Sequence, residues 1–265
     1  MSNVSQNQHA FLKKQKLHRL FVRTCRIFVF VAFLLLWELT TRFGIIDSFV
    51  FSSPSKVILC FWGMVLDRSI FLHIGITLYE TLVSFLLVTL FSILLATLLW
   101  FSRKLLEITE PFLVVLNSLP KSALAPLLIV WLGATPKTIV VAGMSVAIFG
   151  SIMNMSTSFR EVDPEKIKLV YTLRGTKYQA LTKVVIPSCI PAIVSNMKVN
   201  IGLCLVGVVI GEFLAARSGL GYLIIYSSQV FKMDWLLMSI VILCILAMGL
   251  YALINVVEKL YQKYF

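Results

Sequence analysis

The sequence predicts an all-α membrane protein with about six transmembrane helices, and three observations lead to this fold class. Of the 265 residues, 59% are hydrophobic and only 14% are charged, whereas soluble domains are about half apolar and a quarter charged. The net charge of +12 lies between the apolar runs, as expected for lysines and arginines that orient membrane helices. Several runs without charges approach the roughly 20 residues that span a bilayer; they are 27–37, 81–102, 111–120, 138–159, 199–211 and 235–257.

The predicted spans are separated by segments that carry most of the charged residues. A polar, basic stretch at 1–20 is predicted to be a disordered or surface-lying tail. The segment 46–78 mixes apolar and charged residues around Pro54, which indicates an interfacial or re-entrant helix. The third span is predicted to be broken by Pro111, Pro120 and Pro126, because a proline leaves a helix carbonyl without its partner. In chain order, the spans are about 25–45, 79–101, 109–132, 138–159, 187–212 and 234–257.

The distribution of lysine and arginine predicts where the two termini lie. Six spans place both termini on one side of the membrane, and that side carries sixteen of these residues against six on the other. The positive-inside rule therefore predicts that both termini are cytoplasmic. The predicted division is a cytoplasmic basic tail at 1–24, a first span with its interfacial segment at 25–74, a core at 75–257 with a cytoplasmic loop at 160–186, and a cytoplasmic tail at 258–265.

The cytoplasmic loop carries helix-capping signals that a simple linker does not need. Asp163 is a good N-cap, since its carboxylate accepts hydrogen bonds from free backbone N–H groups. Pro164 suits the first helical position, and Glu165 favours the positive end of the helix dipole. The spacing then places Ile167, Val170, Tyr171 and Arg174 on one helix face.

A second short helix is predicted to follow in the same loop. Gly175 is expected to take the left-handed conformation that ends the first helix. The second helix runs from about 177 to 185 and is expected to stop before Pro187. Two capped helices joined by a glycine turn fit either a docking element for a partner protein or an amphipathic connector on the membrane surface.

The loop resembles the "EAA" loop of ABC importer permeases, the inner-membrane components of binding-protein-dependent transport systems. The matching text is KLVYTLRG at 168–175, then Tyr178 and Gln179, then VVIP at 184–187. The likeness extends over about 75–257 and includes LPKSALAPL at 119–127, VDP at 162–164, and Glu212 with SGLGY at 218–222. These last features look most like the branch that serves nitrate, sulfonate, taurine and thiamine-precursor uptake.

This resemblance implies a fold, a function and a set of partners. The fold would be the MetI-like type I ABC importer permease fold in the bacterial inner (plasma) membrane. The chain would form the translocation pathway for a small anion or a thiamine-precursor-like molecule. Its partners would be ABC ATPase subunits, an extracytoplasmic substrate-binding protein, a second copy of the chain in a homodimer, and the lipid bilayer. The residues implied in ATPase coupling are Asp163, Pro164, Lys168, Tyr171, Arg174, Gly175, Tyr178 and Pro187.

The loop departs from the family pattern at its most characteristic positions. Lys168 stands where the pattern has glutamate, and Leu169 and Val170 replace its two alanines. Counting back from Pro187, Arg174 takes the glycine position and Gly175 falls one place later. The expected contact is therefore basic where the family's is acidic, which implies a correspondingly altered ATPase groove or a weakened contact.

Sequence motifs for catalysis are absent, so the chain is predicted not to be an enzyme. It contains no G-x-x-x-x-G-K-[S/T], which means that ATP hydrolysis would need a separate chain. It also has no H-E-x-x-H and no G-x-S-x-G. Its five cysteines and three histidines are scattered without metal-ligand spacing, so no metal or cofactor is expected. The membrane explains the basic charge, so no nucleic-acid partner is expected.

Three charged residues inside the spans are candidates for the translocation pathway, because buried charges in lipid are costly. Lys121 lies between two prolines and could face an anionic substrate, or it could snorkel or pair with Glu110 or Glu212. Lys198 has the same two interpretations. Glu212 could gate one end of the pathway or pair structurally, and Glu80 is expected to be interfacial.

Two other functions remain open at this stage. An ion-coupled secondary transporter would need an intramembrane carboxylate or an inverted repeat, and no convincing repeat is visible. A membrane scaffold without transport activity is the third hypothesis.

Overall fold

The computed structural model describes residues 6–264, and all the regular secondary structure in this part of the chain is helical. Five continuous helices are long and apolar enough to cross a membrane, and a bent pair supplies a sixth candidate. The elements are α1 Gln6–Arg42, α2 Ser48–Phe51, α3 Pro54–Leu66, α4 Ser69–Phe101, α5 Arg103–Ser118, α6 Lys121–Leu132, α7 Pro136–Arg160, α8 Pro164–Thr172, α9 Lys177–Ala180, the π-helix η1 Leu181–Val185, α10 Ile186–Ala215, α11 Leu220–Gln229 and α12 Met233–Tyr264.

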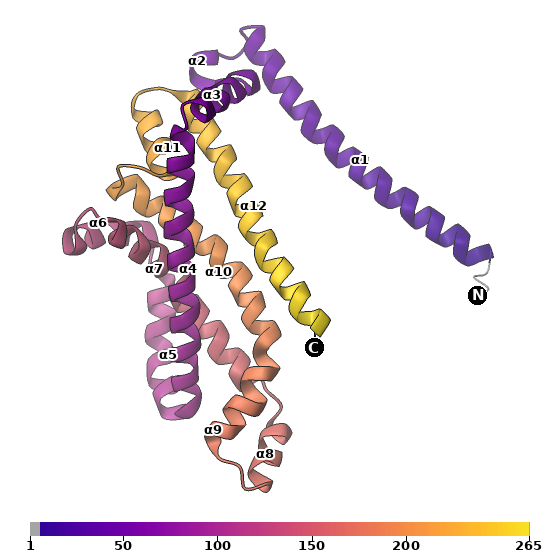
Figure 1. The fold of residues 1–265 in the computed structure, drawn as a ribbon, viewed down its shortest axis with the longest axis vertical. Helices are drawn as coiled ribbons and strands as arrows, with labels where there is room; N and C mark the ends of the chain where they lie inside the picture. The colour runs from indigo at the N-terminus through magenta and orange to yellow at the C-terminus, as the bar shows by residue number, and fades with distance from the viewer. Residues whose placement is uncertain (1–5, 265) are drawn as a thin grey trace.

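Helix α1 is a single long rod that leans away from the other helices (Figure 1). None of the residues in its most apolar stretch is buried. The tail predicted as disordered or surface-lying at 1–20 is helical from Gln6 onward, so it is not disordered in the part that the structure describes, and the surface-lying alternative stays a prediction; residues 1–5 lie outside the described part. The helix of the first predicted span continues towards the N-terminus because residues 6–24 contain no glycine or proline to end it.

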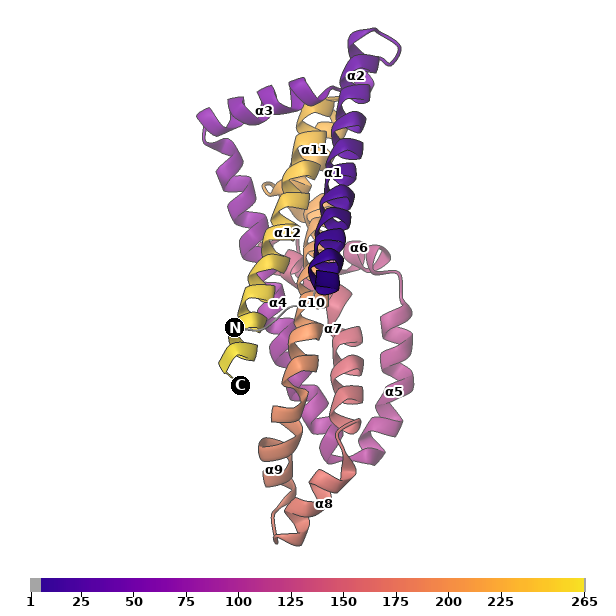
Figure 2. The same ribbon diagram turned by 90° about the vertical axis from the view of Figure 1, so that its right-hand side faces the viewer.

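The core of the bundle is formed by α4, α7 and α10, with α7 packed against both of the others (Figure 2). Two glycines allow the closest approach. A Cβ on Gly207 of α10 would lie 2.8 Å from the carbonyl oxygen of Ala142 and 2.8 Å from the Cα of Gly143, both on α7. Ser84 of α4 donates a hydrogen bond to the Val140 carbonyl of α7 at 3.1 Å. Small residues at helix crossings are the usual basis of packing in lipid.

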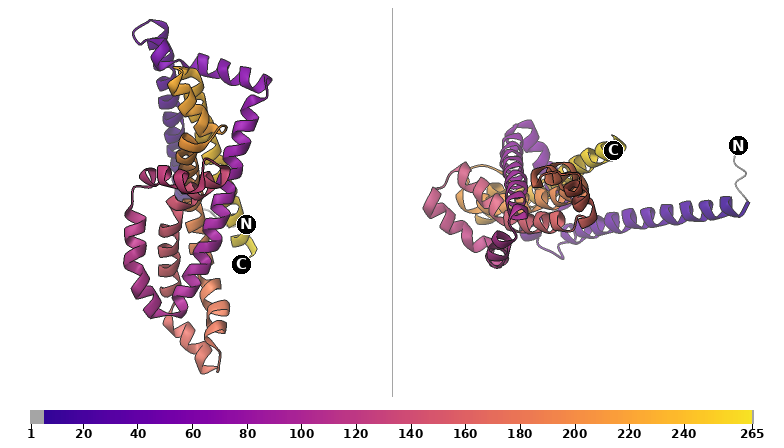
Figure 3. Two further views of the ribbon diagram at one scale, coloured as in Figure 1. Left: turned by 90° about the vertical axis from the view of Figure 1, so that its left-hand side faces the viewer. Right: turned by 90° about the horizontal axis from the view of Figure 1, so that it is seen from below.

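The third predicted span is sharply bent, but only one of its three prolines causes the break. Helices α5 and α6 meet at 96°, and the junction is Leu119–Pro120, with Leu119 in an extended conformation. Proline disfavours the helical conformation in the residue before it, which explains the bend. Pro111 and Pro126 both lie inside helices. Figure 3 shows α6 running across the bundle while α5 runs along it.

Two predicted boundaries are wrong. Helix α4 begins at Ser69, ten residues before the predicted 79, so it takes up the end of the segment assigned as interfacial. The second loop helix does not stop before Pro187, because α9, η1 and α10 run on as one helical segment from Lys177 to Ala215. The wider π-turn makes this possible: Ile186 N donates to Leu181 O, which loosens the turn where Pro187 lacks a donor.

Candidate functional site

The loop between α7 and α10 forms a separate projection at one end of the molecule (Figures 1 and 2). The cap of the first loop helix agrees with the sequence prediction. The Asp163 side chain accepts a hydrogen bond from Glu165 N at 2.9 Å, and Pro164 occupies the first turn of α8. Helix α9 starts with a capping box that was not predicted: Thr176 Oγ1 accepts from Gln179 N at 3.3 Å, and Gln179 Oε1 accepts from Thr176 N at 2.8 Å. The T-x-x-Q spacing at 176–179 carries this signal.

The turn between the two loop helices differs from the prediction. Arg174, not Gly175, adopts the left-handed conformation, with φ of +57°. Gly175 is required for a different reason: its N–H donates to Val170 O at 2.8 Å. A Cβ at Gly175 would lie 2.4 Å from Val170 Cγ1 and 2.7 Å from Val170 O. The left-handed position is therefore the one at which the family pattern has glycine, and here an arginine occupies it.

We expect Arg174→Gly to stabilise the loop and Gly175→Ala to destabilise it. A left-handed conformation costs a non-glycine residue about 1–2 kcal/mol, which Arg174→Gly removes in part, whereas an added Cβ at Gly175 collides with backbone. Limited proteolysis of the loop in the purified protein measures both effects. Slower cleavage of Arg174→Gly and faster cleavage of Gly175→Ala are expected. Equal rates for the two variants would contradict this description of the turn. Trypsin is unsuitable because it cuts at arginine, so a protease that cleaves after aromatic residues is used.

One side of the loop is packed onto the bundle. Val162 is buried and Ile167 is half-buried against a cluster that includes Met155, Phe159 and Leu181. The loop is also tied to α4, since Lys177 Nζ donates to Phe101 O at 2.6 Å and lies 5.6 Å from the centre of the Trp100 ring. These contacts give the loop a fixed attachment to the helices.

The opposite side of the loop is exposed and partly apolar. Leu173 is 75% exposed, Tyr178 66% and Leu169 60%. Lys168 is also exposed, but it lies on the side of α8 that lines a cleft against the bundle. Of the face predicted for α8, Ile167 and Val170 are half-buried, whereas Tyr171 and Arg174 face outward. Large exposed apolar residues beyond the membrane-spanning helices are typical of a surface that contacts a partner.

A second constellation surrounds Glu212 near the end of α10, and it anchors the start of α11. The Glu212 side chain is fully buried. Thr77 Oγ1 donates to its Oε1 at 2.6 Å, and Gly221 N donates to its Oε2 at 2.5 Å. Leu220 N donates in turn to Thr77 Oγ1 at 2.8 Å. Glu212 and Thr77 together thus accept hydrogen bonds from two N–H groups in the first turn of α11, where the N–H groups of a helix have no partners within the helix.

The glycines of the SGLG sequence fit closely around this carboxyl group. Gly219 has φ of +120°, and a Cβ there would lie 2.4 Å from Glu212 Oε1. A Cβ at Gly221 would lie 2.6 Å from Glu212 Oε2. His73 Nδ1 lies 3.0 Å from Gly219 N, which donates to it. Of the two roles considered for Glu212, this geometry supports the structural one.

Glu80, which was expected to be interfacial, is almost completely buried inside the protein, with 2% of its surface exposed. Its carboxyl group lies against that of Glu212. Glu80 lies in the interior because α4 packs against α7 and α10.

The two lysines of the spans have protein partners of their own. Lys198 of α10 forms an ion pair with Glu258 of α12 and donates to Asn255 Oδ1 at 3.2 Å. Lys121 donates to the carbonyls of Leu116 and Asn117 at the end of α5, at 2.5 and 3.0 Å, and does not pair with either predicted glutamate. Cations favour the carbonyl end of a helix. The structure does not bring Lys121, Lys198 and Glu212 together, since each contacts different residues.

A polar cleft between α7 and α10 was not predicted from sequence. Its volume is about 300 Å³. Asn196 Nδ2 and Asn200 Nδ2 both donate to Ser151 Oγ, at 2.7 and 2.8 Å, and Asn154 Nδ2 donates to Asn196 Oδ1 at 3.5 Å. The sequence signal that could have revealed this cleft is the occurrence of polar residues at helical spacing within apolar spans. The cleft is lined by Asn154, Thr157, Ser158, Ala192, Ser195, Asn196 and Val199.

Comparison with known proteins decides the family. The family described as "Binding-protein-dependent transport system inner membrane component" matches residues 88–265. The chain belongs to this family. It is thus a multi-pass inner-membrane permease subunit of an ABC transporter, whose ATPase is a separate subunit.

Several relatives of this permease are named for transport of different small molecules. A Bacillus subtilis permease protein named for aliphatic sulfonates transport is 24% identical over 229 residues, which cover 86% of this chain and 83% of that protein. The riboflavin transport system permease protein of Chloroflexus aurantiacus is 26% identical, with 87% and 86% covered. The formylaminopyrimidine transport permease protein of Halalkalibacterium halodurans is 26% identical, with 73% and 76% covered.

Solved structures confirm the predicted fold of the permease. A chain of the MetNI methionine ABC transporter in an inward-facing conformation matches with a TM-score of 0.65 and 17% identity, over 73% of this chain and 96% of that one. A chain of an amino acid ABC transporter matches with a TM-score of 0.59, over 77% and 98%.

Proposed function

We propose that the α8–α9 loop is the element through which the separate ATPase drives this permease. One observation carries the proposal: the loop is capped at both helices, fixed to the bundle on one side, and exposes Leu169, Leu173 and Tyr178 on the other. A rigid projection of this kind transmits a displacement as a lever, whereas a flexible connector absorbs it. Movement of the ATPase on binding ATP would thus reach α7 and α10.

The charged residues of the loop indicate what kind of surface on the ATPase would bind it. Lys166 and Arg174 are exposed on or beside α8. An acidic groove would complement them, and like charges would repel them at a cost of several kcal/mol. We therefore expect the cognate ATPase to present carboxylates around an apolar pocket.

The coupling proposal predicts that Leu173→Ala and Tyr178→Ala reduce substrate-stimulated ATP hydrolysis. Truncation of a buried interface anchor costs about 2 kcal/mol or more, which corresponds to roughly 30-fold weaker binding of the ATPase. The measurement is ATP hydrolysis by the purified permease with its ATPase and binding protein, with co-purification of the ATPase as a second readout.

Leu66→Ala is the matched control, since Leu66 is 69% exposed at the end of α3, outside the loop. It should retain full ATPase binding. Full activity of both loop variants would remove α8–α9 from the coupling surface.

We further propose that two copies of the permease enclose the translocation pathway and that the polar cleft of α7 and α10 faces it. Asn154, Thr157 and Ser195 are exposed, and polar groups in a span are costly unless they face protein or a water-filled cavity. A purified complex with only one permease of 29.9 kDa would contradict the dimer.

The cleft offers neutral hydrogen-bond donors, which suit the oxygens of a small anion such as a sulfonate or nitrate, or the polar edge of a pyrimidine. Relatives named for sulfonates and for formylaminopyrimidine support these two classes. Competition between labelled and unlabelled compounds of each class in an uptake assay distinguishes them.

A further inference from the structure

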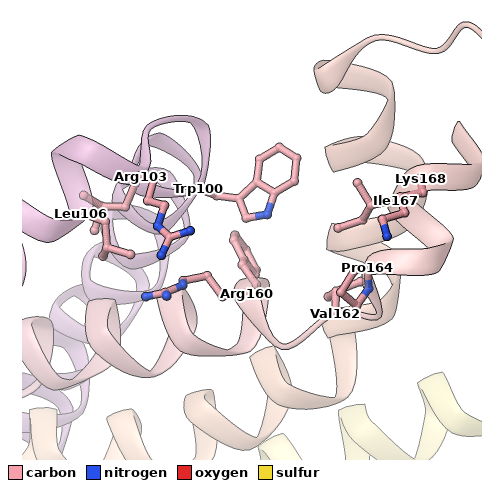
Figure 4. A pocket seen from close by; sticks show the side chains of 10 residues that line it. Trp100, Arg103, Leu106, Arg160, Val162, Pro164, Ile167 and Lys168 are labelled. Carbon is pink, nitrogen blue, oxygen red and sulfur yellow. The ribbon is translucent and has the colours of Figure 1, made fainter. Parts of the chain in front are cut away.

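A basic cleft lies where the coupling loop meets the bundle, at the same end as α8 and α9. Three cationic residues surround it, each from a different helix (Figure 4): Arg103 begins α5, Arg160 ends α7, and Lys168 lies in α8. Figure 4 shows Arg103 and Arg160 on one side and Lys168 on the other. The volume is about 360 Å³. No aspartate or glutamate lines this cleft.

The cations of the basic cleft are incompletely neutralised. Arg103 Nε donates to Glu107 at 3.0 Å, but this pair is largely exposed, and such pairs contribute little. Among the residues that the structure describes, neither Arg160 nor Lys168 has an ion pair. Adjacent guanidinium groups repel each other, and each presents a planar fork of donors that matches phosphate oxygens. An anion with several oxygens could accept hydrogen bonds from both guanidinium groups and would offset their repulsion.

The floor of the basic cleft is apolar, which narrows the class of anion. Apart from its three cations, the cleft is lined by apolar side chains, of which Pro164 is exposed and Trp100 and Ile167 are half-buried. The cleft lies at the ends of the apolar helices α4 and α7, where a membrane surface is expected. A free phosphate ion would use only the cations, whereas a lipid uses the cations and the apolar wall.

We propose that the basic cleft binds the phosphate group of an anionic phospholipid. Basic pockets between membrane helices on the cytoplasmic side recognise lipid headgroups in this way. The bound phosphate would bridge Arg103 and Arg160 to Lys168, and so hold α8 against the turn between α4 and α5. This role goes beyond transport and does not depend on the identity of the substrate.

The test uses Trp100, which lines the cleft, as a fluorescent reporter. The purified full chain is placed in micelles with a low fraction of brominated phosphatidylglycerol or brominated phosphatidylcholine, because bromine quenches nearby tryptophan. Subtracting the signal of Trp100→Phe isolates the reporter. Stronger quenching by the anionic lipid is expected, and loss of one cation in Arg160→Gln or Lys168→Gln should lower the preference roughly fivefold.

Lys104→Gln is the matched control, because it removes a cation beside Arg103 that does not line the cleft; its lipid preference should be unchanged. Equal quenching of the wild type by both lipids would overturn the proposal, whatever the stability of the variants. So would displacement of the lipid by inorganic phosphate in excess, which would assign the cleft to a soluble anion. Displacement by the bound ATPase would assign it instead to an acidic protein surface.

Discussion

Gly207→Ala should destabilise the bundle by about 3 kcal/mol, because it pushes α10 away from α7. The added Cβ would lie 2.8 Å from the Ala142 carbonyl oxygen and from the Gly143 Cα. Both are backbone atoms, so no side chain can rotate to make room. The helices must separate along a crossing that holds the buried residues Ile201, Cys204 and Val208, and their packing is lost with it.

Gly202→Ala on the same helix supplies the matched control. Nothing lies within 4 Å of a Cβ at this position, so the same change meets open space. We expect its stability to be unchanged or slightly higher, since alanine favours a helix more than glycine does. Similar destabilisation by both substitutions would mean that the crossing of α7 and α10 is not as close as described.

The native cysteines allow this unfolding to be measured with a thiol-reactive dye. Cys25 and Cys244 are exposed and would react before unfolding, so both are first replaced by serine. Cys204 is fully buried and Cys189 is 3% exposed, so both should react only when the bundle opens on heating. Burial raises the pKa of Cys60 to about 11, and the nearby Asp234 adds to this, so this thiol remains protonated and slow to react near neutral pH. A decrease of roughly 6–12 °C in the transition is expected for Gly207→Ala.

Glu212→Ala should release α11 from the bundle, whereas Glu212→Gln should retain it. The alanine variant leaves the buried Gly221 N–H and the Thr77 hydroxyl without their acceptor. Each buried group without a partner costs about 1–3 kcal/mol. Glutamine keeps an oxygen acceptor and the size of the side chain, so most of this loss should be avoided.

Two measurements separate the structural role of Glu212 from a gating role. The dye assay reports stability, and uptake reports transport. Loss of both in Glu212→Ala, with both preserved in Glu212→Gln, is the expected pattern. If the glutamine variant were stable but inactive in transport, the carboxylate itself would be needed in gating, and the structural assignment would be wrong.

The α8–α9 loop illustrates how far local sequence signals reach. Asp163 and Pro164 act on neighbouring residues only, so the start of α8 could be predicted, and the T-x-x-Q capping box was available by the same logic. The choice between Arg174 and Gly175 for the left-handed position could not be predicted from residue preference, because glycine is the usual residue there. It depends on where Val170 places its side chain and carbonyl, which exclude a Cβ at Gly175.

The sequence by itself determined the membrane class, most of the long helices, the caps of the loop and the family resemblance, because hydrophobic runs, capping and motif spacing depend on residues close in the chain. The tertiary structure decided which charges are buried and what they contact: Glu80 against Glu212, Lys198 with Glu258, and Lys121 on the end of α5. It also decided that α10 continues through Pro187 and that polar residues of α7 and α10 share one cleft. Apart from the contacts of Lys121 and the helix through Pro187, which involve neighbours in the chain, these features join residues that are distant in the chain, and only the packing of helices brings such residues within hydrogen-bonding distance.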